Sequence, residues 1–284
     1  MSAARHLLLG PASIDRWTDE GRDLPGGGAL NMAYHWAMAG MPSCLLTRVG
    51  SDDGEVVLEF LRRHHIGHLP GSITAAGRSA AIDVVIRPDR QPFMDNFVEG
   101  VWADFHLTAE EEAAIAGAAS VHSVLVDPVA AEVNRLGEAG ALRHLAASGD
   151  FLDFRHYTVD RFAATMHYLS LGFVSWPGEP DDPVVHGIRA VAAELGKQVV
   201  ITLGSRGILV VTGATTRFVT VQAVAVEGTT VGCGDAFIAA FLASHLRGGS
   251  LDDALDHARI AGAATTRWLR PLPDMAYDQR TGNV

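Results

Sequence analysis

Two glycines and a carboxylate stand close together late in the chain, at residues 232–235. Gly232 and Gly234 flank the small Cys233, and Asp235 follows at the start of a predicted helix over 235–246. Backbone N–H groups left uncovered at the positive end of a helix bind anions. Two interpretations are open: Asp235 is a helix cap, or it takes a proton from an attacking hydroxyl while the nearby amides hold the negative charge that develops.

A second glycine-rich segment, Gly26-Gly27-Gly28, precedes a predicted helix over 31–39. Three glycines allow a ligand to approach the backbone closely, and Asn31 offers both a donor and an acceptor to a sugar hydroxyl. The alternative is a flexible loop followed by a helix that Asn31 caps. The contiguous glycines do not have the spacing of a dinucleotide-binding fingerprint.

A third candidate is the end of the apolar segment 198–203, where Thr202 and Leu203 are followed by Gly204 and Gly207. A continuous apolar run that ends at a glycine predicts a buried strand. Open α/β sheets bind their ligands at the carboxyl ends of the strands, which makes this segment a candidate ligand site. A plain β-turn is the alternative interpretation.

Composition and the remaining motifs exclude several classes of protein and kinds of site. The 284 residues carry a formal charge of −11 and one lysine, Lys197, which argues against a Walker-type phosphate loop and against a basic nucleic-acid-binding face. The two cysteines fit a reducing cytosol, and no apolar run approaches the ~20 residues that cross a bilayer. His64, His65 and His68 have no acidic or cysteine partner, so we expect a solvated helix end there rather than a metal site. The expected protein is cytoplasmic, with neither a nucleic-acid nor a membrane partner.

The pattern of apolar residues predicts the scaffold that must position these segments. Strand-like and helix-like segments alternate, which predicts an α/β fold with a mostly parallel sheet covered on both faces. Thr108, followed by three glutamates, predicts a helix start, and the polar residues 278–284 predict a loose tail. The segments 80–87 and 93–97, joined by a Pro-Asp turn, predict a hairpin outside the main alternation. Strands are predicted at 6–9, 44–49, 121–126, 151–153, 168–174, 198–203, 208–211 and 217–225, and helices at 31–39, 55–63, 130–147, 184–195, 235–246 and 251–267.

Together, in their order and spacing, the three glycine-containing segments resemble the ribokinase-like, or PfkB, family of carbohydrate kinases over nearly the whole chain. The family signature Asp-Thr-x-Gly-Ala-Gly-Asp-x-Phe is met at most positions by 229–237. The Gly-Gly pattern followed by Asn and Ala is met by Gly26, Gly27, Asn31 and Ala33, and the Thr-Leu-Gly strand end by 202–204. A looser match to Gly-x-Asp-x-x-Gly lies at 50–54.

The resemblance implies a single kinase domain over 1–284 with a three-layer α/β/α fold and a small β lid from about 14–24 and 79–97. It implies phosphoryl transfer from ATP to an alcohol group with the help of Mg²⁺. Asp235 would be the base, and the amides of Gly232, Cys233 and Gly234 would form the anion hole. Sugar hydroxyls would be held by Asp15, Gly27, Gly28 and Asn31. The nucleotide would be held by Ser175, Glu179, Thr202, Gly204, Gly207 and Thr230, with Glu179 also serving Mg²⁺.

A finer resemblance is to the branch of the family that phosphorylates fructosamines such as fructoselysine at the 6-hydroxyl. It rests on the run 99–107, on Val121-His122 and on the stretch 175–179. Most of the wider family has Asn-x-x-Glu near that stretch, whereas Ser175 and Glu179 stand in here with one residue more between them. Two other interpretations are open: a kinase for another sugar or a nucleoside, and a non-catalytic sugar-binding regulator that kept the fold.

Two positions depart from the family signature. Thr229 replaces an aspartate that in many relatives helps to hold a monovalent cation, so potassium activation does not carry over and a monovalent cation is left open. Cys233 replaces an alanine, which is conservative because backbone forms the anion hole. Its thiol could have a lowered pKa at the helix N-terminus, or it could be buried and inert.

The predicted lid leads to two further expectations. Phe93, Met94 and Phe97 either line it or pack beneath it. In relatives such lids often pair two subunits, which makes a homodimer through the lid an expectation carried by the resemblance.

Overall fold

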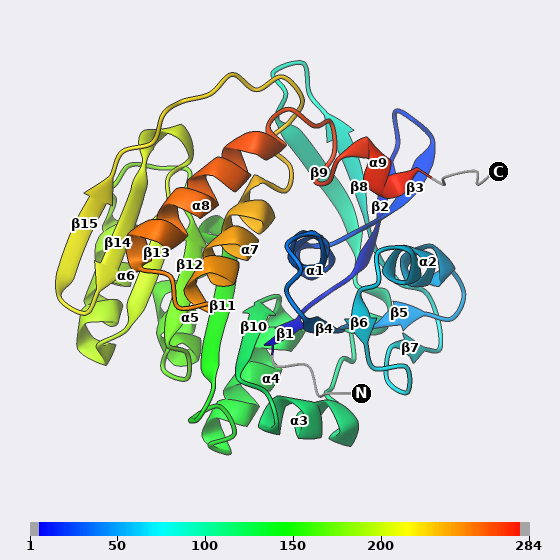
Figure 1. The fold of residues 1–284 in the computed structure, drawn as a ribbon, viewed down its shortest axis with the longest axis horizontal. Coiled ribbons are helices and arrows are strands. Elements are labelled where there is room, and N and C mark those ends of the chain that lie inside the picture. Colours follow the sequence, from blue (N-terminus) through cyan, green and yellow to red (C-terminus); the bar gives the residue numbers. More distant parts are fainter. Residues whose placement is uncertain (1–5, 279–284) are drawn as a thin grey trace. The chain divides into compact units, whose positions relative to one another are not determined.

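The computed structural model describes residues 6–278, which fall into two compact units (Figure 1). The first unit comprises 6–10, Pro42–Leu46 and Asp104–Ala223. The second comprises Pro11–Met41, Thr47–Ala103 and 224–278. Each unit is therefore assembled from segments that are distant in the sequence. The predicted loose tail lies outside the described residues, except for Asp278.

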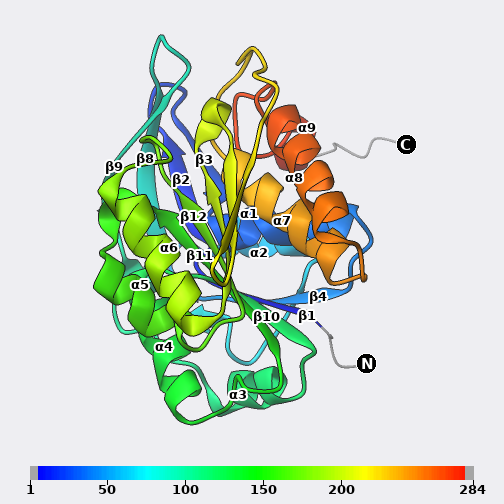
Figure 2. The ribbon, with the colours of Figure 1, turned by 90° about the vertical axis from the view of Figure 1, so that its left-hand side faces the viewer.

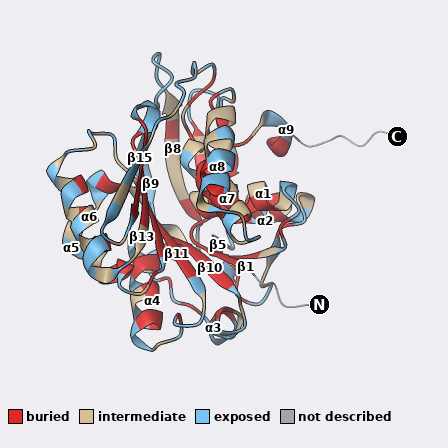
Figure 3. Ribbon diagram, turned by 60° about the vertical axis from the view of Figure 1, so that its left-hand side comes forward, coloured by how far each residue is buried: buried red, intermediate tan, exposed pale blue. Residues whose placement is uncertain are grey.

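The first unit contains a mostly parallel sheet with the strand order β15-β14-β13-β12-β11-β10-β1-β4 (Figures 1 and 2). Neighbouring strands from β4 to β13 are parallel, while β14 and β15 are antiparallel additions. Buried residues run continuously along β10, β12 and β13, as a parallel sheet requires, whereas the edge strand β15 is largely exposed (Figure 3). The strand bounds are β1 His6–Leu9, β4 Ser43–Leu46, β10 Ser120–Val124, β11 Ala146–Asp153, β12 Leu171–Ser175, β13 Gln198–Thr202, β14 Ile208–Thr212 and β15 Thr215–Val219. The predicted α/β fold with a mostly parallel sheet is confirmed.

The helices of the first unit follow the predicted alternation with two exceptions. Their bounds are α3 Ala109–Ala116, α4 Asp127–Glu138, α5 Val159–Met166 and α6 Pro183–Leu195. The Thr108 side chain caps α3 as predicted, in a reciprocal capping box with Glu111. The helix predicted over 130–147 is wrong in its second half: Gly140 turns the chain with φ 75°, and the segment from Ala146 onward pairs as β11. Helix α5 carries only two turns of apolar residues and was not predicted.

The second unit contains a four-stranded sheet in the order β3-β2-β8-β9. Its strands are β2 Ser13–Trp17, β3 Arg22–Gly26, β8 Ala80–Ile86 and β9 Pro92–Val98, and the β8–β9 pair confirms the predicted hairpin. The short strands β5 Val49–Gly50, β6 Gly67–His68 and β7 Thr74–Ala75 belong to the same unit. The segments predicted as a lid form this sheet, and their closing over a substrate stays a prediction. Phe93, Met94 and Phe97 are 42%, 45% and 53% exposed, so they do not pack beneath the sheet.

Helices α1 and α7 form the core of the second unit and bring two of the predicted site segments together. The helix bounds are α1 Gly28–Met38, α2 Glu55–Arg63, α7 Cys233–His245, α8 Leu251–Thr265 and α9 Asp274–Tyr277. The indole of Trp36 on α1 is fully buried and donates to the Ala239 carbonyl of α7 at 2.9 Å. On its other side α7 packs against α8, where Gly262 leaves room for the Cys233 carbonyl. The start of α7 is therefore held between two helices.

No helix within residues 6–278 is both long enough and apolar enough to cross a membrane.

Candidate active site

Asn31 and Asp235 form the centre of the candidate site, in the second unit. Asn31 lies in the first turn of α1 and Asp235 in the first turn of α7. The Asn31 Nδ2 donates to Asp235 Oδ2 at 2.7 Å. Asn31 is buried, and its Oδ1 has no hydrogen-bond partner among the described residues. Because buried acceptors almost always have a donor, this oxygen is suited to accept a hydrogen bond from a ligand hydroxyl.

Asp15 adds a second carboxylate to the site from strand β2. Its side chain is buried and accepts a hydrogen bond from the Ser13 hydroxyl at 2.8 Å. Gly26, on the neighbouring strand β3, makes room for it, because a Cβ at that position would lie 2.1 Å from the Asp15 carboxylate. The first glycine of the Gly-Gly-Gly run is thus needed to seat Asp15.

Burial perturbs both carboxylates, and repulsion adds to the shift of Asp15. Burial raises the pKa of Asp15 to about 6; the Ser13 hydrogen bond opposes the shift and the negative charge of Asp235 adds to it. Burial also raises the pKa of Asp235, and the hydrogen bond from Asn31 partly offsets that rise. A carboxylate whose pKa lies nearer to neutrality is a better proton acceptor at physiological pH. Of the two, Asp235 lies at the start of a helix, next to exposed backbone amides.

The other two glycines of the first segment shape the start of α1. Gly27 caps the helix with φ 96°, and a Cβ there would lie 2.5 Å from the Pro11 carbonyl oxygen, so only glycine fits. Gly28 is the first helical residue. The alternative of a flexible loop is therefore not supported, since the Gly27 carbonyl also accepts the Asn31 amide at 2.9 Å.

The start of α7 presents backbone amides of the kind that bind anions. Gly232 adopts φ 76°, and a Cβ there would lie 2.6 Å from Pro271 Cα, whereas a Cβ on Gly234 would meet nothing within 4 Å. The amides of Gly234 and Asp235 have no acceptor among the described residues, as is usual in a first helical turn. The Cys233 amide, predicted as part of the anion hole, donates to the Thr230 carbonyl in a long contact of 3.3 Å.

The Cys233 thiol is half-buried, and its pKa is raised rather than lowered. Burial raises the pKa of this thiol; a hydrogen bond from the Thr265 hydroxyl at 2.9 Å opposes the rise, and the nearby Asp235 adds to it. The alternative of a lowered pKa at the helix N-terminus is therefore wrong. Desolvation outweighs the dipole of α7 at this position.

We expect native protein at pH 7.5 to resist iodoacetamide, because both thiols stay protonated and Cys44 is also buried, with a pKa raised to about 11. We further expect Cys233→Ala to keep near-normal turnover, since the side chain makes no predicted contact with a ligand. Mass spectrometry of labelled protein, with urea-unfolded protein as the control for reactivity, measures the first expectation. Rapid labelling of Cys233 that abolishes activity would contradict both.

In the first unit, the structure brings Ser175 and Thr202 together. They end the adjacent parallel strands β12 and β13, and their hydroxyl oxygens lie 3.1 Å apart. Gly204 and Gly207 then turn the chain with φ 60° and 140°, and a Cβ on Gly207 would strike the Phe218 ring. The strand end is thus a specific turn with two hydroxyls at the carboxyl edge of the sheet, where ligands of open α/β sheets bind.

Two side chains that the sequence did not single out hold the loop 176–179. The Asp182 carboxylate accepts hydrogen bonds from the Trp176 indole and from the Glu179 amide, both at 2.8 Å. Arg206, at the end of the short 3-10 helix Gly204–Arg206, donates to the Gly178 carbonyl at 3.0 Å and also to that of Pro177. Asp182 precedes Pro183 at the start of α6, and this Asp-Pro helix start was the available sequence signal.

Glu179 is the one predicted metal ligand. Its carboxylate is 69% exposed and lies 3.8 Å from the Arg206 guanidinium. Residues 6–278 contain no group of three or more His, Cys, Asp or Glu side chains that could hold an ion. Mg²⁺ at phosphate sites is commonly held by one or two carboxylates, waters and the phosphates themselves, so a single exposed carboxylate fits that role.

The threonine pair before α7 has roles within its own unit. The Thr230 hydroxyl donates to Gln91 Oε1 at 3.1 Å, and Gln91 belongs to the turn of the β8–β9 hairpin. Thr229 is fully buried; its hydroxyl accepts from the Val231 amide at 3.3 Å and its amide donates to the Trp268 carbonyl at 2.8 Å. Gln91 was not predicted as a site residue, because nothing local marks a turn glutamine as a contact of a residue 139 positions away.

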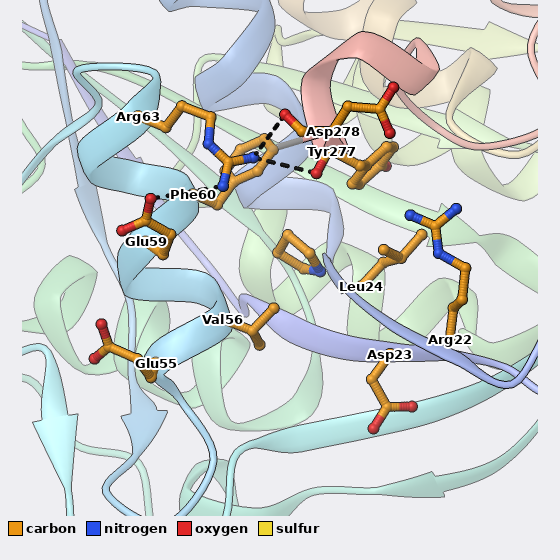
Figure 4. A pocket seen from close by; sticks show the side chains of 11 residues that line it. Arg22, Asp23, Leu24, Glu55, Val56, Glu59, Phe60, Arg63, Tyr277 and Asp278 are labelled. Atoms are coloured by element: carbon orange, nitrogen blue, oxygen red, sulfur yellow. Dashed lines mark hydrogen bonds and ion pairs between the residues drawn. The ribbon is translucent and has the colours of Figure 1, made fainter. Parts of the chain in front are cut away.

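A cavity of about 530 Å³ lies elsewhere in the second unit and contains none of the predicted site residues (Figure 4). It lies among β3, α2 and α9, where Arg63 donates to the carbonyls of Tyr277 and Asp278 at 3.2 and 3.4 Å. His64, at the end of α2, likewise contacts the Ala276 carbonyl at 2.8 Å and packs on Phe60. The histidine cluster thus anchors α9 through His64 instead of forming a solvated helix end.

Comparison with known proteins shows which proteins this chain is similar to. The family model described as pfkB family carbohydrate kinase matches residues 172–268. Fructoselysine 6-kinase of Escherichia coli (strain K12) is 28% identical over 263 residues, which are 92% of this chain and 96% of that one. The fold is shared with adenosine kinase from Sinorhizobium meliloti, with a TM-score of 0.80, 17% identity and coverage of 97% and 98% of the two chains. It is also shared with Arabidopsis thaliana ribokinase complexed with ribose and ATP, with a TM-score of 0.74, 19% identity and coverage of 95% and 96%.

The family model covers α7 and its glycine-flanked aspartate, and the curated relative extends the similarity to nearly the whole chain. Solved structures of ribokinase-like kinases match the fold over the same length. The chain is therefore similar to pfkB family carbohydrate kinases, and these similarities support a phosphotransferase of the sugar and nucleoside kinase type.

Proposed function

We propose that the protein transfers the γ-phosphoryl group of ATP to a primary hydroxyl of a small sugar, and that the sugar is a fructosamine such as fructoselysine. One observation carries the proposal: Asp235 is hydrogen-bonded to a buried Asn31 whose Oδ1 still lacks a donor, beside amides at the start of α7 that lack acceptors. A base, a hydroxyl acceptor and an anion-binding helix end in one place are what phosphoryl transfer to an alcohol requires.

In the proposed reaction, Asp235 accepts the proton of the attacking hydroxyl as its oxygen forms a bond to the γ-phosphorus. The bond between that phosphorus and the bridging oxygen breaks, and ADP leaves. Asn31 holds Asp235 in place through the hydrogen bond from its Nδ2. Its Oδ1 accepts a hydrogen bond from a second sugar hydroxyl. The amides of Gly232, Cys233 and Gly234 stabilise charge on the transferring oxygens, and the long Cys233–Thr230 contact is weak enough to be exchanged.

The proposed sugar site is completed by Asp15, Gly27 and Gly28. The Asp15 carboxylate accepts hydrogen bonds from sugar hydroxyls. Its close packing against Gly26 keeps it in one orientation. The proposed lid, residues 14–24 and 79–97, excludes water from the reacting groups. The Thr230–Gln91 hydrogen bond links its hairpin turn to the segment that leads into the anion hole.

For the nucleotide we propose Ser175, Glu179, Thr202, Gly204, Gly207 and Thr230. Asp182 and Arg206 act as positioning residues for the loop that carries Glu179. Mg²⁺ is assigned to the Glu179 carboxylate and the phosphates; when bound, it neutralises charge on the phosphate oxygens. Because the Thr229 hydroxyl is already used within its own loop, a monovalent cation is no part of the proposal.

The fructosamine substrate rests on the similarity to fructoselysine 6-kinase along nearly the whole chain. The exposed apolar residues Phe93, Met94 and Phe97 on strand β9 support a proposed homodimer through the lid sheet.

A panel of acceptors tests the proposed function. Fructoselysine, fructose, ribose and adenosine are each incubated with ATP and MgCl₂, and ADP release is measured. We expect the highest kcat/KM with fructoselysine and a product whose ³¹P–¹H coupling places the phosphate on C6. Higher kcat/KM with ribose or adenosine would replace the fructosamine by that substrate. Ligand-induced rises in Tm without ADP release from any acceptor would favour a sugar-binding regulator.

A further inference from the structure

A second cavity, of about 340 Å³, lies in the first unit at the amino ends of three parallel strands. It is lined by Ala147 at the start of β11, by Ser170 just before β12 and by Lys197 just before β13. The loop that follows α4 and the end of α5 supply the remaining walls. None of the predicted site residues lines it.

The charges around this cavity have one sign. Arg143, His167 and Lys197 all line it, and no aspartate or glutamate does. Within residues 6–278, none of these three side chains forms a hydrogen bond or an ion pair. In a chain with a formal charge of −11 and a single lysine, a lysine and an arginine around one hollow that no acidic residue lines are unusual. Most other arginines in the structure have a carboxylate or carbonyl partner, as Arg135 does with Glu132.

The walls of the cavity are held by close packing. Gly137 is the penultimate residue of α4. A Cβ at Gly137 would lie 2.1 Å from Cγ of the Tyr168 ring, so the glycine admits this ring into the wall. The Tyr168 ring in turn meets the His167 imidazole edge-on, with centroids 5.0 Å apart. Gly196, in the left-handed region with φ 65°, turns the chain so that Lys197 begins the next strand.

The polar groups that remain free are mostly donors. The Lys197 backbone is already used, since its amide donates to the Ala192 carbonyl and its carbonyl accepts the Gly213 amide. The Ser170 hydroxyl donates to the Ala147 carbonyl at 2.8 Å. What is left to face a ligand is the Lys197 ammonium, the Arg143 guanidinium and the His167 ring. Guanidinium and ammonium groups together suit a phosphate dianion, which takes several charge-assisted hydrogen bonds at once.

We propose that this cavity binds the phosphate group of a small phosphorylated ligand, at a site separate from the proposed active site. The two sites use opposite ends of the same strands: Ser170 and Lys197 precede β12 and β13, while Ser175 and Thr202 end them. Five residues of strand separate each pair, which at about 3.3 Å per residue is a span of roughly 16 Å. A single small ligand cannot occupy both ends.

The cavity shown in Figure 4 does not support an equivalent proposal. Arg63 is already engaged there by backbone carbonyls, and Glu55 and Glu59 both pair with Arg62, so these three charged groups already have partners within the protein. The 340 Å³ cavity differs because Arg143 and Lys197 have no such partners in the described part of the chain.

The test is a titration of ¹⁵N-labelled full-length protein with inorganic phosphate at constant ionic strength, followed by amide chemical shifts. We expect saturable shifts of Tyr168, Ser170 and Lys197. The double variant Arg143→Gln, Lys197→Gln should bind at least tenfold more weakly, because each lost charge-assisted hydrogen bond weakens binding about tenfold or more. Arg189→Gln, on α6 and outside the cavity, removes a charge of the same sign and should bind as the unaltered protein does.

The location of the shifts separates this site from the proposed active site. Shifts confined to residues 230–236, or shifts around the cavity that the double variant retains in full, would overturn the proposal. So would equal weakening by Arg189→Gln, which would mark a diffuse charge effect. A parallel titration with a hexose monophosphate, compared with inorganic phosphate, identifies whether the ligand is a free phosphate or a phosphate ester. Unchanged melting curves of the variants confirm that they are folded.

Discussion

Asp235→Asn is expected to lower kcat by about 10²–10⁴-fold, the range that a positioned general base contributes. Asparagine preserves the size of the side chain and can still bond to Asn31, but it cannot accept the proton of the attacking hydroxyl. The melting temperature should stay the same or rise, because the buried carboxylate has a raised pKa and its charge is costly in the folded state. ADP release under saturating substrates measures kcat, and calorimetry measures the melting temperature.

The competing interpretation of Asp235 as a helix cap makes the opposite prediction. A cap contributes to stability without affecting chemistry, so its loss would lower the melting temperature and leave kcat intact. Asp160→Asn is the matched control, since Asp160 is also the acidic residue in the first turn of a helix, α5. Near-normal turnover of Asp235→Asn on the true substrate would show that the base has been misassigned.

The acid limb of the pH–rate profile gives an independent check on Asp235. Because burial raises the pKa of its carboxyl, kcat/KM is expected to fall as the pH drops through that raised value. The residual activity of Asp235→Asn should lack this limb. Retention of the same limb by the variant would assign it to Asp15 instead.

Asp15→Asn is expected to have opposite effects on substrate binding and on stability. KM for the sugar should rise about 10- to 100-fold, because a hydrogen bond to a charged acceptor typically contributes about 1.5–3 kcal/mol. Stability should increase at alkaline pH. Burial raises the pKa of Asp15 to about 6 in the folded protein, so the carboxyl favours folding while it is protonated and loses that contribution as the pH rises through about 6.

The size of this stability effect follows from linkage. With folded and unfolded pKa values of about 6 and 3.8, the unaltered protein should lose about 1–1.5 kcal/mol between pH 5 and pH 8 that Asp15→Asn does not lose. Urea unfolding at both pH values measures the difference. Asp23→Asn, on the exposed end of the adjacent strand β3, is the control and should show no pH-dependent difference. Parallel stability curves for Asp15→Asn and the unaltered protein would contradict the assigned burial of this carboxylate.

The elements that carry these two carboxylates could be predicted from the sequence. The sequence alone predicted the alternation of strands and helices, because buried parallel strands need continuous apolar runs such as 198–202. It also determined the backbone of the site, since Gly27 and Gly232 occupy conformations that only glycine adopts comfortably. Apolar runs and glycine conformations involve residues that are adjacent in the sequence, so the sequence alone can predict them.

Which side chains meet depends on tertiary packing. Asn31 and Asp235 are 204 residues apart, and their hydrogen bond exists because Trp36 anchors α1 on α7. The raised pKa of Cys233 likewise comes from burial against α8, which outweighs the local helix dipole that the sequence pattern emphasised. The three basic residues of the 340 Å³ cavity come from separate loops with no shared motif. Contacts between distant segments depend on packing, desolvation and the lack of competing partners, and none of these is set by the spacing of residues along the chain.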